Sequence, residues 1–166
     1  MKLPQILAKF LLVSAFAAVL PVAAQPLVQD PRAIVIEDVS RGDFITTLDA
    51  LKKQLEIDGW NIVAEINLGA RLAKKKVAIP GGLVILELTS GKNAVPLLQN
   101  EDTRYVAALM PCSVAVYGMS DGRVVVSRMN TGMLAGMLEP WVAAVMNTAS
   151  RDLDETISRA LAKSGG

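Results

Sequence analysis

The sequence contains no histidine and a single cysteine, Cys112. Catalytic triads built on serine or cysteine with histidine, histidine-ligated haem and most zinc sites require imidazole side chains, so this chain cannot form them by itself. One cysteine cannot close a disulfide within the chain, although exported domains often use paired cysteines. The stability of the fold must therefore come from packing.

Aromatic residues and excess charge are also scarce. Phe, Trp and Tyr make up 4% of the chain, whereas hydrophobic residues make up 52%, so we expect an aliphatic core. The formal net charge is +1, and a nearly neutral protein has no field that would attract nucleic acid. The basic cluster at residues 74–76, three lysines, is typical of a solvated surface. The sequence therefore predicts no nucleic-acid partner.

The first residues combine the features of a secretory signal peptide. Lys2 and Lys9 precede an uncharged, mainly apolar run at 10–20, which Pro21 ends. A membrane-spanning helix needs about 20 apolar residues, and this run is shorter. Small side chains follow up to Ala24. We expect cleavage after Ala24 and a periplasmic or secreted protein without a membrane anchor, the alternative being an uncleaved anchor.

Removal of residues 1–24 changes both the charge and the length. The segment holds two of the 17 basic residues and none of the 16 acidic ones, which leaves a formal charge of −1. The remaining 142 residues are enough for one domain with a single core. We expect a lead-in at 25–32, an α+β domain at 33–130 and a helical extension at 131–166.

Hydrophobic periodicity predicts the order of the secondary-structure elements. Runs rich in β-branched and aliphatic residues predict strands at 33–39, 60–66, 83–88 and 105–109 and a hairpin over 113–128. Apolar spacings of three and four predict helices at 44–55, 94–98 and from residue 133 onward, while 68–73 forms either a helical turn or an ordered loop. This order is typical of a two-layer α+β fold, in which helices pack on one face of a mainly antiparallel sheet.

Glu87 interrupts an otherwise apolar run at 83–88. Such a run predicts a central strand buried on both faces. A carboxylate there must be paired, protonated or directed into a cavity, which makes Glu87 a candidate pocket residue. The alternative is a position on the solvent face of an edge strand, because buried glutamate is rare.

Cys112 follows Pro111 at the expected start of a strand. It is either a small buried hydrophobic residue or a reactive or metal-binding thiol. Met129, Met133 and Met137 recur every four residues, which would place them on one helical face. Thiolate and thioether are soft donors that suit Cu(I), so Cys112 with these methionines is a candidate metal site. Methionine at helical spacing is more often core filler or a pliable contact surface.

Several of these segments occur together in the order of one known family. They are a helix with Phe44, Leu48 and Leu51 that ends in Asp58-Gly59-Trp60, the strand LVILEL, the short helix with Asn93-Ala94 and Leu97-Leu98, the stretch Leu109-Met110-Pro111-Cys112, and a Val-Ala-Val-Tyr strand before an Asp121-Gly122 turn. Over residues 33–130 the chain resembles the DUF302 family of bacterial and archaeal proteins. The resemblance implies a small two-layer α+β fold and a homodimer. It supplies no catalytic residues, because the family's activity is not established.

These observations favour an exported, non-enzymatic module that binds a small ligand or a protein partner. The binding cleft would have aliphatic and methionine side chains and would include Glu87, Pro111 and Cys112. No cofactor is predicted. The alternatives are Cu(I) handling through Cys112 and the methionines, and an enzyme that uses a carboxylate such as Glu87, which the missing histidines make the least favoured.

Overall fold

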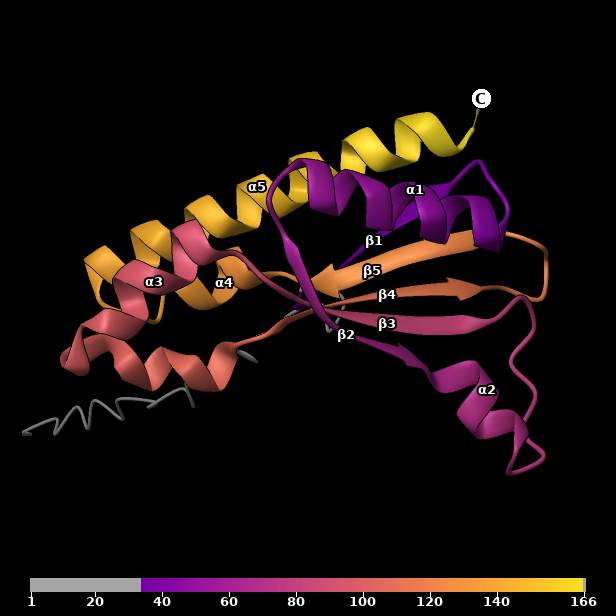
Figure 1. Cartoon of the computed structure of the whole chain (residues 1–166), viewed down its shortest axis with the longest axis horizontal. Coiled ribbons are helices and arrows are strands. Elements are labelled where there is room, and N and C mark those ends of the chain that lie inside the picture. Colours follow the sequence, from indigo (N-terminus) through magenta and orange to yellow (C-terminus); the bar gives the residue numbers. More distant parts are fainter. Residues whose placement is uncertain (1–33, 166) are drawn as a thin grey trace, which may run out of the picture.

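The computed structural model describes residues 34–165, so the expected signal peptide and lead-in lie outside the described residues. Five strands form one sheet in the order β1-β5-β4-β3-β2, and every neighbouring pair is antiparallel (Figure 1). The strands are β1 (Val35–Ser40), β2 (Asn61–Asn67), β3 (Leu83–Thr89), β4 (Cys112–Gly118) and β5 (Val124–Met129).

Two long helices, α1 (Phe44–Ile57) and α5 (Pro140–Ser164), lie across one face of the sheet (Figure 1). The short helices α3 (Gly91–Gln99) and α4 (Thr131–Ala135) gather at one end of the sheet beside the first half of α5, and α2 (Leu68–Ala73) follows the edge strand β2. The two-layer α+β fold predicted from the sequence is therefore confirmed. Between residues 34 and 165, no helix has the length and apolar character needed to cross a membrane.

The main core lies between the sheet and the two long helices. The N-cap residue Asp43 starts α1, where its carboxylate accepts a hydrogen bond from the Thr46 amide at 2.9 Å. From there the predicted apolar stripe is directed at the sheet. The fully buried residues of this core are Leu51, Leu55, Leu86, Leu88, Val114, Val116, Val126 and Ile157. α5 therefore belongs to the core that holds the sheet together.

β3 is buried on one face only. Leu86 and Leu88 are fully buried beneath the helices, whereas Glu87 between them is half-buried on the opposite face. The expectation of a strand buried on both faces is wrong, because the helices cover a single face of this antiparallel sheet. β3 pairs with both β2 and β4, so it is not an edge strand either.

The strand expected at 105–109 is also wrong, because these residues belong to a 3-10 helix, η2 (Glu101–Leu109). The Asn100 side chain accepts a hydrogen bond from the Asp102 amide at 3.0 Å, and the Thr103 hydroxyl donates to the Leu97 carbonyl at 2.7 Å. Val106 is buried against the end of α3, whereas Tyr105 is exposed. Side-chain capping outweighs the strand propensity of this short segment.

The helix expected at 94–98 is present but begins earlier, at Gly91. The Ser90 carbonyl accepts hydrogen bonds from the amides of Asn93 and Ala94. Pro96 therefore lies inside α3 rather than in its first turn, where the missing N–H interrupts one helical hydrogen bond. The earlier start brings Ser90 and Asn93 to the same end of the sheet as Trp60.

Candidate functional site

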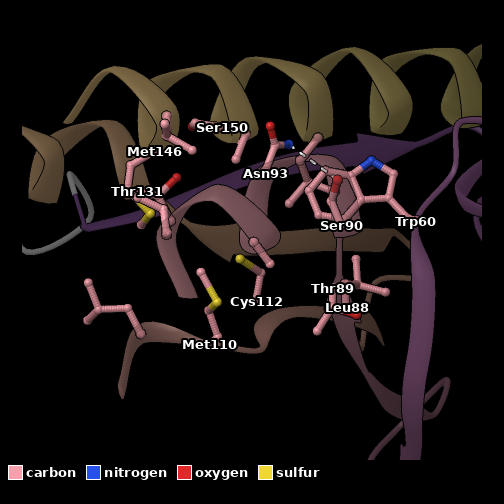
Figure 2. Close-up of a pocket in the computed structure, with 16 residues that line it drawn as sticks. Trp60, Leu88, Thr89, Ser90, Asn93, Met110, Cys112, Thr131, Met146 and Ser150 are labelled. Atoms are coloured by element: carbon pink, nitrogen blue, oxygen red, sulfur yellow. Dashed lines mark hydrogen bonds between the residues drawn. The ribbon is translucent and has the colours of Figure 1, made fainter. Parts of the chain in front are cut away.

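A largely apolar pocket lies where α3 and α5 meet the ends of β3 and β4 (Figure 2). Its cavity volume is about 40 Å³, and it is partly open to solvent. All of the lining residues belong to the described part of the chain, and none of them is charged. They are Trp60, Leu88, Thr89, Ser90, Asn93, Ala94, Leu97, Leu109, Met110, Cys112, Thr131, Val145, Met146, Ala149, Ser150 and Leu153.

The pocket separates two hydrophobic clusters. The main core supplies Trp60, Leu88 and Leu153 to its wall. A second cluster, formed where α3, η2 and α4 meet the start of α5, supplies Leu97 and Met146. Side chains at such a gap lose packing partners on one side, so a group that fills the gap would regain those contacts.

One end of the pocket carries neutral polar groups. The Ser90 hydroxyl accepts a hydrogen bond from the Asn93 amide nitrogen at 3.3 Å, and Ser90 is only 7% exposed. The same nitrogen lies 3.4 Å from a carboxylate oxygen of Asp152. The Lys92 ammonium, 2.9 Å from that carboxylate, is the main cause that holds the pKa of Asp152 below its usual value. The charge of Asp152 is thus neutralised outside the pocket, and a hydroxyl and an amide line its wall.

Another part of the wall carries sulfur. Met110, Cys112 and Met146 all line the pocket, and Figure 2 shows the side chains of Met110 and Cys112 directed into it. Met110 and Pro111, joined by a cis peptide bond, form the corner between η2 and β4. Burial, followed by the negative charge of Glu87, raises the pKa of the Cys112 thiol. The thiol is therefore protonated, and uncharged, at neutral pH.

Of the three residues expected to bind a ligand, only Cys112 lines this pocket. Pro111 is exposed at the corner. Glu87 lies on the sheet face opposite the helices, where both of its carboxylate oxygens accept from the Ser113 hydroxyl, at 2.9 and 3.0 Å. The structure thus places Glu87 and Cys112 on neighbouring strands but not in one cavity.

Met129, Met133 and Met137 do not share a helical face. Met129 ends β5, where it pairs with Val35, and only Met133 lies within α4. Met129 is not helical, because the sheet continues to that residue and the Asn130 side chain caps α4 by accepting from the Met133 amide. The helix expected from residue 133 onward is divided into α4 and α5. The three methionines are 51%, 40% and 83% exposed, and none lines the pocket. Within residues 34–165, no three or more His, Cys, Asp or Glu side chains are placed to hold a metal ion.

Several pocket residues are not among the candidates that the sequence indicates. Trp60, Ser90, Asn93 and Met146 are separated by up to 86 positions in the chain and come from three different segments. Trp60 and Asn93 lie in motifs that carry the family resemblance, and Met110 lies two residues before Cys112. None of these positions predicts a shared cavity, because helix packing alone brings the residues together.

Comparisons with known proteins identify the family. The model of a domain of unknown function, DUF302, matches residues 36–163 and so includes both walls of the pocket. The fold is similar to the crystal structure of an uncharacterized conserved DUF302 protein from Bacillus stearothermophilus, with a TM-score of 0.69 and 20% identity over 76% of this chain and 98% of that chain. No curated protein matches the sequence. Because the family model covers most of the chain, this protein belongs to the DUF302 family.

Proposed function

We propose that this DUF302 protein is an exported binding module, and that its pocket between α3, α5 and β4 takes a small, uncharged, largely apolar ligand. The observation that carries the proposal is the lining of the pocket. Aliphatic, aromatic and sulfur-containing side chains from two hydrophobic clusters form its walls, and a few neutral polar groups lie at one end. Small-molecule pockets typically have this composition, in which apolar walls supply affinity and polar groups fix orientation.

The size of the cavity limits the shape of the ligand. A volume of about 40 Å³ exceeds the roughly 10–15 Å³ that one water needs, but it is far below the roughly 150 Å³ of an engineered cavity that binds benzene. An alkyl chain or another slender group therefore fits better than a ring system. Ser90 accepts from Asn93 and can still donate its own hydrogen, so a ligand hydroxyl or carbonyl at this end would be recognised.

We propose binding without catalysis, because the polar groups of the pocket are a poor set for proton transfer. Acid–base catalysis requires groups whose pKa lies near the working pH. Hydroxyls, an amide and a thiol whose pKa is raised by burial do not meet this requirement. Glu87, the candidate carboxylate, lies on the other face of the sheet.

Straight-chain primary alcohols of increasing length test this proposal. Trp60 lines the pocket and is one of two tryptophans, so its fluorescence reports binding in a Trp141→Phe background. Each added methylene is expected to raise the affinity about fourfold until the chain fills the pocket, because burial of one CH2 group contributes about 0.8 kcal/mol.

A matched pair of substitutions locates the binding. Ala94→Phe places a ring in the pocket wall and is expected to abolish binding, whereas Ala70→Phe on the exposed side of α2 leaves it unchanged. Thermal melts establish that both variants are folded. Equal affinities of the two variants, or an affinity that does not depend on chain length, would refute the pocket as a ligand site.

Export is tested separately, by intact mass and N-terminal sequencing of the protein from a bacterial host. Because the start of the chain has the charge, apolar run and small residues of a cleaved signal, we expect Gln25 as the first residue of protein in the periplasm or medium. Recovery only of a chain that starts at Met1, inside the cell, would contradict export. A native mass spectrum of the same sample reports whether the expected homodimer forms.

A further inference from the structure

We propose that Met110, Cys112 and Met146 bind a soft monovalent metal ion, Cu(I), on the sulfur-bearing wall of the pocket. This inference goes beyond the binding of an apolar ligand and does not depend on it. It also replaces the methionines at 129, 133 and 137, which share no face and do not line the pocket, with a set of sulfur-bearing residues around one cavity.

Three separate elements supply the donors. Met110 lies at the corner after η2, Cys112 is the first residue of β4, and Met146 comes from α5 on the other side of the pocket (Figure 2). Met146 is only 5% exposed and Cys112 is half-buried, so folding has already removed most water from these sulfur atoms. A site whose ligands are ordered by packing loses little entropy when it binds an ion.

The charge balance of the pocket favours a monovalent ion. A thiolate and two thioethers carry one negative charge, so they form a neutral complex with Cu(I). A neutral complex suits a cavity without charged lining residues, because burial of a net charge is costly. A divalent ion with the same three donors would keep a positive charge, and Zn(II) sites use imidazole or several thiolates instead. Softness is a second and separate reason, because soft thiolate and thioether ligands select the soft ion Cu(I).

The binding step involves no change of oxidation state. Cu(I) forms a bond to the Cys112 sulfur, the thiol proton passes to solvent, and the two methionine sulfurs donate lone pairs. The cavity volume of about 40 Å³ is larger than the space of one water molecule, so the pocket has room for an ion.

The test is an anaerobic titration of the reduced protein with Cu(I) in competition with bicinchoninate, a coloured Cu(I) chelator. We expect one Cu(I) per chain and loss of competition in Cys112→Ser. Met110→Leu and Met146→Leu keep nearly the same side-chain volume. Each is expected to weaken Cu(I) binding at least roughly tenfold, because even the loss of a residue that only supports a metal ligand lowers the metal affinity by about that factor.

Met133→Leu and Met137→Leu are the matched controls, because these methionines are exposed and lie outside the pocket. Both are expected to bind Cu(I) like the wild type. Failure of the wild type to compete, wild-type affinity in both pocket leucine variants, or weakening only in the exposed ones would each overturn the assignment.

The two proposals are tested by separate titrations of the wild-type protein, one with the alcohols and one with Cu(I). Failure of the alcohol titration with intact Cu(I) binding would refute the proposed ligand alone, and the reverse result would refute the metal site alone. Unchanged melting temperatures show that a loss of either binding is not a loss of the fold.

Discussion

Replacement of Ile157 by alanine is expected to lower the free energy of unfolding by about 2–5 kcal/mol. Ile157 is fully buried between α5 and the sheet, in the same cluster as Leu55 and Val126. The shorter side chain loses the transfer free energy of the removed carbons and leaves a cavity that the neighbouring strands cannot fill by relaxation. Equilibrium unfolding in urea, with the slope compared between variants, measures the loss.

Ile45→Ala is the matched control, because Ile45 lies on the outer side of α1 and is 63% exposed. Its effect is expected within about 0.5 kcal/mol. If the two alanine variants unfold alike, α5 is an appendage on a domain that is already complete. A large difference shows that α5 is part of the single core, as expected from a family match that runs to residue 163.

Arg128→Ala is expected to cost about 3 kcal/mol, the lower end of the range for breaking a buried ion pair. Its guanidinium lies on the helix-covered side of β5 and donates to Asp38 of β1 and to Asp154 of α5, both at 2.6 Å. The Arg128 side chain is 7% exposed, whereas the two carboxylates are 42% and 39% exposed. The lower end applies because both carboxylates can be hydrated once the arginine is gone.

Arg123→Ala tests whether burial causes this effect. Arg123 pairs with Asp121 at 2.7 Å in the β4–β5 hairpin, where both side chains are more than half exposed. Surface pairs contribute about 0–1 kcal/mol, so this variant is expected to unfold almost like the wild type. A double-mutant cycle of Arg128→Ala with Asp154→Asn then measures the coupling of β5 to α5. A coupling near zero would mean that Arg128 acts through packing alone.

The candidate site was only partly accessible to prediction. A single thiol in a chain that begins like an exported protein makes Cys112 a candidate, and the structure places it in the pocket wall. Glu87 is a candidate because it interrupts an apolar run, but the run alternates between a covered and an uncovered face of the sheet, and Glu87 lies on the uncovered one. A pattern of residue types predicts which side chains are unusual, but it does not predict what lies above or below the sheet.

The sequence by itself determined the α+β class, the α1 helix, and the hairpin whose turn contains Asp121 and Gly122, because each depends on contacts between residues near in the chain. Only the tertiary structure decided that 101–109 form a 3-10 helix, that Met129 ends a strand, and that the sulfur atoms of Cys112 and Met146 line one cavity. The physical reason is the distance along the chain over which each interaction acts. Periodicity and capping act over one or two turns, whereas the pocket is the gap between two hydrophobic clusters and exists only once α5 packs against β3 and α3.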